Sequence, residues 1–550
     1  MTLQCRDLST MPADIAAVGA QVLAPTNRYR VIGDHLADLL DDAQFAALYD
    51  TRGRNALSPA LLAMVTLFQF LEDIPDREAA EQVVVRLDWK YALHLPLEDT
   101  GFDHSCLCYF RQRVLDQHQD TLVFETILGK VRALGFLKKR GKQRTDSIAV
   151  LGAVRQLSAL ETVTETLRLA VRALTAADAA WLGQAVPASF ADQYADLRPD
   201  DRLTAEEQAA LFRQVGRDGY WLLDRLEEAP APLRDLAAVT VLQEVWAQRY
   251  TRDAGVVTVR TEVVPCTERI VTPHDPGVRA GEKRGKKWHG EKVHVTETVE
   301  AEAGLPTFMT DVTTANASSG DAETLPEIRA QLVERDLRPA EQYVDSGYIS
   351  GLQLAQSQAA GIELVGPPLQ DTSPNGFKIA DFALDRDAKQ AICPQGHHSV
   401  KWSERTERDG SRAVNIQFAA ADCAACPLRA HCTTGKSGRS LHLSAHYDLL
   451  VARRVEAQTD AFRERMRARP AIEATLSELV RAHGLRRHRY RGAAKRPFEN
   501  LLKAAACNLK RLVRALVARE PRAAAALPCE PRPGRAPALR ALVHAPTVAA

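Results

Sequence analysis

The chain has 550 residues, 26% of them charged, and a formal net charge of +1. This length accommodates several domains with a large buried core. The near-neutral charge excludes a protein that is basic overall, so a nucleic-acid interface has to come from local clusters of Lys and Arg. Residues 1–25 lack the pattern of a signal peptide, and no segment approaches the roughly 20 apolar residues that a membrane helix needs. We therefore expect a cytoplasmic protein without a membrane partner.

The N-terminal part of the chain predicts helices after a short leader. Residues 1–32 are expected to be a flexible leader, and residues 33–138 a helical domain. Ser58 and Pro59 are typical of a helix start, since a Ser side chain caps free N–H groups and Pro suits the first turn. Ser105 predicts the start of a further short helix. Two interpretations stay open: a helix-turn-helix domain that binds DNA, or a helical domain with an ordinary apolar core.

The middle of the chain predicts an α/β core interrupted by insertions. Residues 139–151 contain a strand with Asp146 at its head, and residues 255–390 alternate strands and helices, which suits a mixed sheet flanked by helices. Residues 152–254 are rich in Ala, Leu and Glu and predict a helical insertion in this core. The remaining boundaries place a small Cys-bearing β insertion at 391–445, the C-terminal part of the core at 446–515 and a disordered tail at 516–550.

Three acids stand where metal ligands are expected in such a core. Asp146 and Asp345 accompany short apolar strands, and Glu473 opens a helix that leads into a basic tract. Mg²⁺ prefers hard oxygen ligands, so a few carboxylates can hold a metal pair for phosphodiester chemistry. Each acid taken alone is equally well explained as a solvated or helix-capping residue. Their order along the chain and the elements that carry them indicate a catalytic site.

Four of the ten cysteines cluster in the predicted β insertion. Cys393 begins a Cys-Pro-Gln-Gly segment, Cys423 and Cys426 form a close pair, and Cys432 follows. Four thiolates at this spacing predict a tetrahedral structural Zn²⁺ site in a reducing compartment. Three alternatives stay open: a His ligand in place of one Cys, an iron–sulfur cluster, or reduced thiols packed in a small core. The histidines concerned are His397, His398 and His431.

A dense basic tract lies between residues 481 and 496 and contains no acid. Clusters of Lys and Arg neutralise DNA phosphates and release counterions. A solvated basic surface is the alternative, and the position of the tract shortly after Glu473 favours nucleic acid. The residues predicted to bind DNA are Arg469, Arg481, Arg486, Arg487, Arg489, Tyr490, Arg491 and Lys495.

Several blocks of the sequence between about Gly33 and Val513 carry a resemblance to a known family. They are Gly53-Arg54 with Ser58–Leu62, Asp88–Leu93, Arg144–Ser147 with Val150–Arg155, Trp288–His294 with Thr296–Thr298, Val344–Tyr348, Cys423–Cys432, and Gly484–Arg487 with Arg489–Gly492. In combination they resemble the DDE transposases of bacterial insertion sequences, in particular the group with a helical N-terminal domain and a Cys-bearing insertion.

The resemblance implies an RNase H-like catalytic core whose three carboxylates are Asp146, Asp345 and Glu473. It also implies two Mg²⁺ or Mn²⁺ ions, cleavage of the ends of an insertion sequence, and joining of those ends to target DNA. The implied partners are the terminal inverted repeats and the target DNA, on which the protein would act as a dimer in the nucleoid. Two alternatives stay open: an inactive or domesticated relative that only binds DNA, and a metal-dependent nuclease without strand transfer.

One signature of related transposases is only partly present. Relatives often carry Tyr-x2-Arg-x3-Glu-x6-Lys around the catalytic Glu. Here Arg469 stands at the Arg position before Glu473, whereas Met466 and Val480 occupy the Tyr and Lys positions. Glu478, five residues further on, is therefore the alternative third acid.

Overall fold

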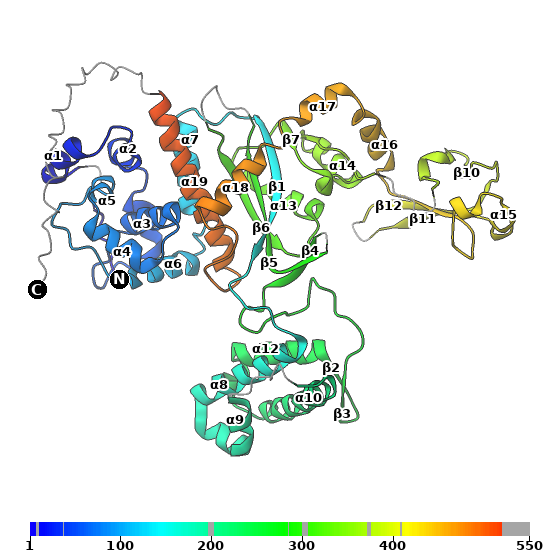
Figure 1. Ribbon diagram of the computed structural model, residues 1–550, viewed down its shortest axis with the longest axis horizontal. Coiled ribbons are helices and arrows are strands. Elements are labelled where there is room, and N and C mark those ends of the chain that lie inside the picture. Colours follow the sequence, from blue (N-terminus) through cyan, green and yellow to red (C-terminus); the bar gives the residue numbers. More distant parts are fainter. Residues whose placement is uncertain are drawn as a thin grey trace, which may run out of the picture.

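The computed structural model of the protein describes residues 1–6, 10–36, 38–195, 203–283, 285–299, 306–370, 376–407 and 410–519. It has the mixed α/β character that the sequence predicts. A curled sheet lies at the centre, and three groups of elements surround it: the N-terminal helices on one side, a Cys-bearing segment on the opposite side, and a helical insertion at one end (Figure 1). Residues 520–550, where a disordered tail is expected, lie outside the described residues.

The central sheet combines antiparallel and parallel pairing. Its strands run in the order β4-β5-β1-β7-β8, and β6 also pairs with β5. The pairs β1·β5, β4·β5 and β5·β6 are antiparallel, whereas β1·β7 and β7·β8 are parallel. The strands are β1 (Lys142–Leu151), β4 (Arg279–Lys283), β5 (Lys286–Thr298), β6 (Met309–Asn316), β7 (Glu341–Tyr343) and β8 (Glu363–Val365).

Helices cover the sheet and connect its strands, as the alternating pattern predicts. The helices that follow β6, β7 and β8 are α13 (Asp321–Glu334), the short 3-10 helix η2 (Ser346–Tyr348), α14 (Gly351–Ala359), α16 (Tyr447–Glu456), α17 (Asp460–Met466), α18 (Ile472–Ala482) and α19 (Lys495–Arg519). Helix α18 contacts β1, and α19 contacts β6 as well as the N-terminal helices. The last helix thus joins the N-terminal helices and the sheet in one hydrophobic core.

The N-terminal helices are α1 (Ala13–Val22), α2 (Arg28–His35), η1 (Asp42–Leu48), α3 (Pro59–Glu72), α4 (Asp76–Val85), α5 (Leu87–Ala92), α6 (Ser105–Asp116) and α7 (Leu122–Ala133). The start predicted at Ser58 is confirmed, since its Oγ accepts a hydrogen bond from the Leu61 N–H at 3.1 Å. The expectation of a flexible leader over residues 1–32 is wrong, because α1 and the start of α2 form there. Ile15 and Tyr29 are buried, so tertiary packing stabilises helices whose local signals are weak.

The helical insertion is present and has a hydrophobic core of its own. Its elements are α8 (Ala159–Ala185), α9 (Ala188–Ala195), α10 (Ala205–Glu227), α11 (Ala231–Arg234), α12 (Ala237–Arg249) and the hairpin β2 (Tyr250–Asp253) and β3 (Val256–Val259). Trp246 lies against Gly219, where a Cβ atom would sit 2.1 Å from the indole ring. Only glycine therefore permits this contact between α10 and α12.

The Cys-bearing segment forms small sheets on the side of the core away from the N-terminal helices (Figure 1). Its elements are η3 (Ile379–Asp381), β9 (Ala383–Asp385), β10 (Gln390–Ile392), β11 (Ser399–Thr406), β12 (Arg412–Phe418), α15 (Ala420–Ala425), η4 (Arg429–His431) and β13 (Ser440–Leu443). A separate cluster of buried residues, including Phe382, Ile416 and Phe418, stabilises it.

Candidate functional site

Asp146 lies on β1, and Asp345 lies two residues beyond the end of β7, the neighbouring parallel strand. Arg144 of β1 pairs with Tyr343 of β7, so Asp146 and Asp345 each follow a paired position by two residues. The sequence predicts Asp146 at the head of its strand. The structure places it within β1, because the strand begins four residues earlier at Lys142. Asp345 follows β7, and its Oδ1 caps η2 by accepting the Gly347 N–H at 2.9 Å.

Arg469 links the three predicted catalytic acids. Its guanidinium lies 2.7 Å from Asp146 Oδ2, 3.9 Å from Asp345 Oδ2 and 3.8 Å from Glu473 Oε1. Glu473 is in the first turn of α18, and its side chain is 70% exposed. It therefore contacts Arg469 from the solvent-exposed side of the site. The structure therefore gathers Asp146, Asp345 and Glu473 around one cation, although they are far apart in the sequence.

Buried polar contacts fix Arg469 and α18 against the sheet. Arg144 of β1 donates from Nη1 to the Ala468 carbonyl at 2.8 Å, directly before Arg469. The Arg144 Nε also donates to Glu297 Oε1 at 2.7 Å, and Thr475 of α18 donates to Glu297 Oε2 at 2.6 Å. Glu297 is fully buried, so these charge-assisted bonds are strong and define the position of Glu473 relative to β1.

The electrostatics of Asp146 favour a bound cation. Burial raises the pKa of this carboxyl, and the nearby Asp345 raises it further, while Arg469 and the Ser147 N–H oppose the shift. The Ser147 N–H donates to Asp146 Oδ1 at 2.8 Å. A desolvated carboxylate beside a second one is costly unless a positive charge lies between them, and the guanidinium supplies that charge here.

A fourth acid, Asp321, lies beside the predicted three. Its Oδ1 accepts a hydrogen bond from Ser147 Oγ at 3.1 Å and pairs with the Lys292 ammonium at 3.1 Å. A Cβ atom on Gly347 would lie 2.8 Å from Asp321 Oδ2 and 3.1 Å from Asp345 Oδ1. The sequence offered no signal for this residue, because an Asp in the first turn of a helix is ordinary.

His294 and Tyr348 form a buried pair near the acids. Tyr348 of η2 and His294 of β5 share a hydrogen bond of 2.6 Å between Oη and Nδ1. Burial lowers the pKa of His294 to about 4, so the imidazole is neutral at neutral pH. Burial and the neighbouring carboxylates Asp321, Asp146 and Asp345 raise the pKa of Tyr348 well above its ordinary value. The pair is therefore an uncharged support for η2.

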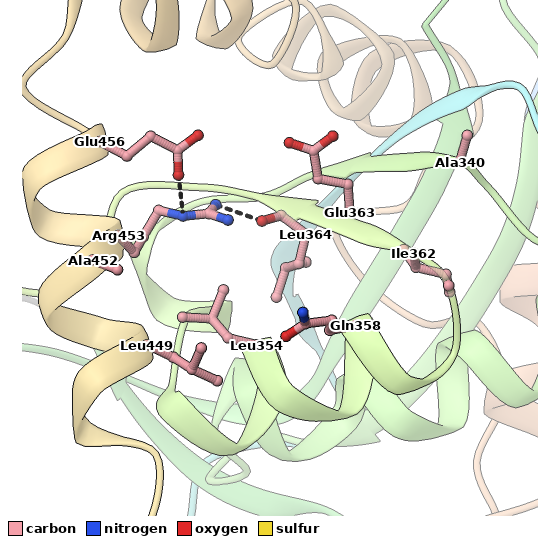
Figure 2. A pocket seen from close by; sticks show the side chains of 11 residues that line it. Ala340, Leu354, Gln358, Ile362, Glu363, Leu364, Leu449, Ala452, Arg453 and Glu456 are labelled. Carbon is pink, nitrogen blue, oxygen red and sulfur yellow. Dashed lines mark hydrogen bonds and ion pairs between the residues drawn. The ribbon is translucent and has the colours of Figure 1, made fainter.

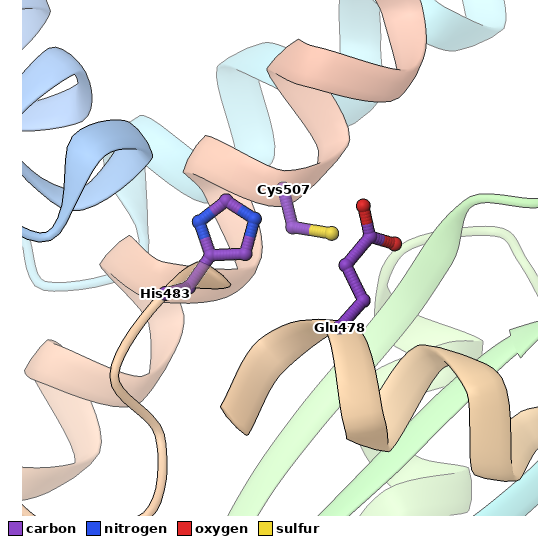
Figure 3. A group of neighbouring side chains, drawn as sticks. All are labelled: Glu478, His483 and Cys507. Atoms are coloured by element: carbon purple, nitrogen blue, oxygen red, sulfur yellow. The ribbon is translucent and has the colours of Figure 1, made fainter. Parts of the chain in front are cut away.

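Glu478, the alternative third acid, has different partners. It pairs with Lys510 and Arg511, each at 2.8 Å. Burial alone would raise the pKa of Glu478, but these two cations lower it to about 2. Figure 3 shows Glu478 close to His483 and Cys507, a grouping whose donor atoms lie within 4.8 Å of one another. Two cations already neutralise the carboxylate, and burial raises the pKa of the Cys507 thiol to about 12, so this group suits a structural role better than a metal.

The basic tract is not one continuous helix, and its side chains divide into two sets. Helix α18 ends at Ala482, and the chain then runs beside the end of β1, where Leu151 donates to the Arg486 carbonyl at 3.0 Å and accepts from the His488 N–H at 2.8 Å. Lys495 begins α19. The exposed set consists of Arg481, Arg486, Arg487 and Arg491.

The other set packs inside the protein. Arg489 donates to the Ile74 carbonyl at 2.6 Å and lies over the Phe70 ring, 5.1 Å from its centre. Tyr490 lies under the Arg111 guanidinium, and burial raises the pKa of its hydroxyl to about 12. Arg489 and Tyr490 thus hold the N-terminal helices against the core, a role that the sequence did not indicate.

The four clustered cysteines converge in the Cys-bearing segment. Cys393, Cys423, Cys426 and Cys432 line one cavity of about 30 Å³. The Arg439 backbone N–H donates to Cys423 Sγ at 3.4 Å. Burial raises the pKa of Cys432, and the other three thiols act in the same direction. His397 also lines the cavity, whereas His398 and His431 do not belong to its lining.

Two family models match the chain. Residues 392–513 match a model described as a transposase DDE domain, and residues 19–113 match one described as a transposase domain (DUF772). The chain is a DDE-type transposase of the insertion-sequence kind. Searches of curated proteins and of solved structures return no match. The first matched segment contains Arg469, Glu473 and the clustered cysteines, whereas Asp146 and Asp345 lie outside both segments.

Transposases of this type act on DNA and generally use divalent metal ions. Among the described residues of the transposase, no helix is both long and apolar enough to cross a membrane.

A groove of about 710 Å³ lies between α14 and α16 along the edge strand β8 (Figure 2). Arg453 donates to the Leu364 carbonyl at 2.5 Å and so covers part of that edge. None of the three acids lines this groove, which is therefore separate from the candidate site.

Proposed function

We propose that this transposase cuts the ends of an insertion sequence and joins them to target DNA in an RNase H-like catalytic core. The strand arrangement supports the fold assignment. Three antiparallel strands, β1, β5 and β6, are followed by two strands parallel to β1; Asp146 lies on β1, and Asp345 directly follows the adjacent strand β7. The observation that carries the proposal is the gathering of three carboxylates around the Arg469 guanidinium.

The donor set fits Mg²⁺ or Mn²⁺. Asp146, Asp345 and Glu473 supply hard oxygen ligands, and the guanidinium stands in for a cation at the same place. Two such ions would stabilise the attacking and the leaving oxygen of a phosphodiester exchange. Backbone N–H groups hold Asp146 on β1 and Asp345 at the start of η2, whereas the exposed Glu473 approaches them from α18.

Several residues around the acids would position the DNA. Arg469 offers a planar donor group for a phosphate of the terminal strand. The exposed arginines Arg481, Arg486, Arg487 and Arg491 would bind phosphates further along the duplex, and Lys495 lies at the end of the same tract. The domain of residues 33–138 would help to recognise the terminal inverted repeats. Because two ends must be held together, we expect a dimer on DNA, acting in the nucleoid of the cytoplasm.

We also propose a structural Zn²⁺ site in the insertion of residues 391–445. The four cysteines line a cavity whose volume of about 30 Å³ suits a single ion or water rather than a larger ligand. The Arg439 backbone N–H donates to Cys423 Sγ at 3.4 Å, and a metal would take the four sulfur atoms as thiolates. An iron–sulfur cluster and packed thiols would be distinguished by metal content and colour. Zinc here would stabilise the insertion and would not take part in catalysis.

The test of the proposed function uses a supercoiled plasmid that carries the DNA flanking the gene, with Mg²⁺. Asp146→Asn, Asp345→Asn and Glu473→Gln should each reduce cleavage by roughly a hundredfold or more while DNA binding persists. Glu464→Gln, a change of an exposed acid on the neighbouring helix α17, is the matched control and should cleave normally. Normal cleavage by all three variants would refute the proposal.

Two further outcomes of the same assay separate the alternatives. Binding without any cut would indicate an inactive relative, and nicking without joined products would indicate a nuclease. Loss of cleavage in Glu478→Gln but not in Glu473→Gln, in proteins of equal thermal stability, would transfer the third catalytic position to Glu478.

A further inference from the structure

The hairpin of β4 and β5 ends in three exposed lysines, Lys283, Lys286 and Lys287. Lys283 and Lys286 are direct cross-strand partners, and like charges in that position destabilise a sheet. Lys287 faces Glu282 at 4.0 Å, but both side chains are largely exposed, so this pair contributes little. Proteins mostly avoid like charges at directly paired strand positions, and exceptions to such local rules are expected at functional sites.

The hairpin is held in a defined place. Gly281 of β4 lies against the Trp288 ring, since a Cβ atom there would be 2.3 Å from it. At the base, Gly290 passes directly over β1, where a Cβ atom would lie only 1.9 Å from the Val150 carbonyl oxygen. The Gly152 N–H also donates to the His289 carbonyl at 2.9 Å. These contacts fix the base of the hairpin against β1.

The hairpin adjoins both the acids and the exposed arginines. Strand β5 of the hairpin pairs along β1, the strand that carries Asp146. Leu151 of β1 pairs with Gly290 at the base of the hairpin on one side and with Arg487 of the basic tract on the other. The lysines and the exposed arginines therefore belong to adjoining elements on either side of β1.

We propose that the tip of the β4–β5 hairpin is a phosphate clamp that holds the DNA backbone beside the three acids through Lys283, Lys286 and Lys287. A polyanion placed between the lysines removes their mutual repulsion. The phosphates of such a polyanion are repelled by the three carboxylates, so cations nearby are needed to hold the backbone at the site. The inference rests on the proposed function in one respect, which is that DNA is the polyanion.

The test measures binding of a random-sequence DNA duplex over a salt series without divalent metal, so that no cleavage occurs. Log affinity falls as log salt rises, and the triple variant Lys283→Ala, Lys286→Ala, Lys287→Ala should make this negative slope shallower by roughly 2 to 3 units. The corresponding triple Arg variant should retain the slope. Lys401→Ala, which removes an exposed strand lysine in the Cys-bearing segment, is the control and should not change it.

A second measurement uses the unaltered protein and so avoids any folding defect of the variants. Acylation of lysines, read by mass spectrometry with and without the duplex, should show protection of the three hairpin lysines and not of Lys401. An unchanged salt slope together with unprotected lysines would overturn the clamp and leave these lysines as a solubilising edge.

These readouts are separate from the cleavage test. If Asp146→Asn abolishes cleavage but the hairpin lysines affect neither slope nor protection, the proposed function stands and the clamp is lost. If the plasmid is never cut but the lysines control the slope, the clamp stands as a DNA-binding surface and the catalytic proposal fails.

Discussion

Replacement of Arg496 by Met should destabilise the transposase without changing how steeply salt weakens its DNA binding. Arg496 belongs to the basic tract by sequence, but its side chain is only 2% exposed. It pairs with Asp275 and, at 2.8 Å, with Glu291. Its charge is therefore neutralised inside the protein, where DNA cannot reach it.

The size of the effect follows from what the substitution leaves behind. Removal of one partner from a buried ion pair costs about 3–5 kcal/mol, because the remaining charge is left uncompensated. Glu291 would keep His488 at 3.2 Å, and Asp275 would keep the Gly492 N–H at 2.9 Å. These surviving contacts place the expected loss near the lower end, at about 3 kcal/mol.

The assay compares Arg496→Met with Arg487→Ala, which removes an exposed arginine of the same tract. Thermal and denaturant unfolding should be affected by Arg496→Met alone, and the salt slope of DNA binding by Arg487→Ala alone, by roughly one unit. A folded Arg496→Met protein with wild-type stability and a reduced salt slope would refute this division of the tract.

The remaining predictions concern a buried histidine and the cysteine cluster. Burial alone would lower the pKa of His488, but contacts with Glu291 and Glu499 outweigh it and raise the pKa. The stability that this adds is complete below the unfolded pKa of about 6.5 and is lost as pH rises through the higher folded value, so His488→Gln should lower the thermal midpoint more at pH about 6 than at pH about 9. An equal loss at both would contradict this. Purified protein should contain about one Zn²⁺ per chain, and Cys426→Ser should reduce both metal content and stability; equal stability without metal would indicate packed thiols, and a brown protein would indicate iron.

The elements with strong local signals could be predicted from the sequence. Ser58 and Pro59 define the start of α3 because the cap depends only on neighbouring residues. The alternation of strands and helices from β5 onward likewise predicted the mixed sheet. The strand expected directly after Gly255 is an exception, because β3 pairs with β2 in the helical insertion and not with the central sheet. The helices near the N-terminus were missed because their stability comes from packing, as the contact between Gly19 and the Tyr91 ring illustrates.

In the candidate site, too, the sequence predicts what depends on local signals but not what depends on tertiary contacts. The order of the three acids and the family resemblance predict them, but their common contact with Arg469 depends on how β1, β7 and α18 meet. The buried bonds of Arg144 and Thr475 to Glu297, which bring these elements together, connect residues more than 150 positions apart. No periodicity or local motif encodes such contacts. For the same reason the sequence could not separate the exposed Arg487 from the neighbouring Arg489, which packs on Phe70.

Anomalous diffraction from crystals of the protein soaked in Mn²⁺ tests directly whether Asp146, Asp345 and Glu473 form one metal site. We expect anomalous density between Asp146 and Asp345, with the Arg469 guanidinium displaced from its contact with Asp146. Crystals of Asp146→Asn should lack that density. Manganese bound instead at Glu478, His483 and Cys507, or absent from the three acids at saturating Mn²⁺, would contradict it.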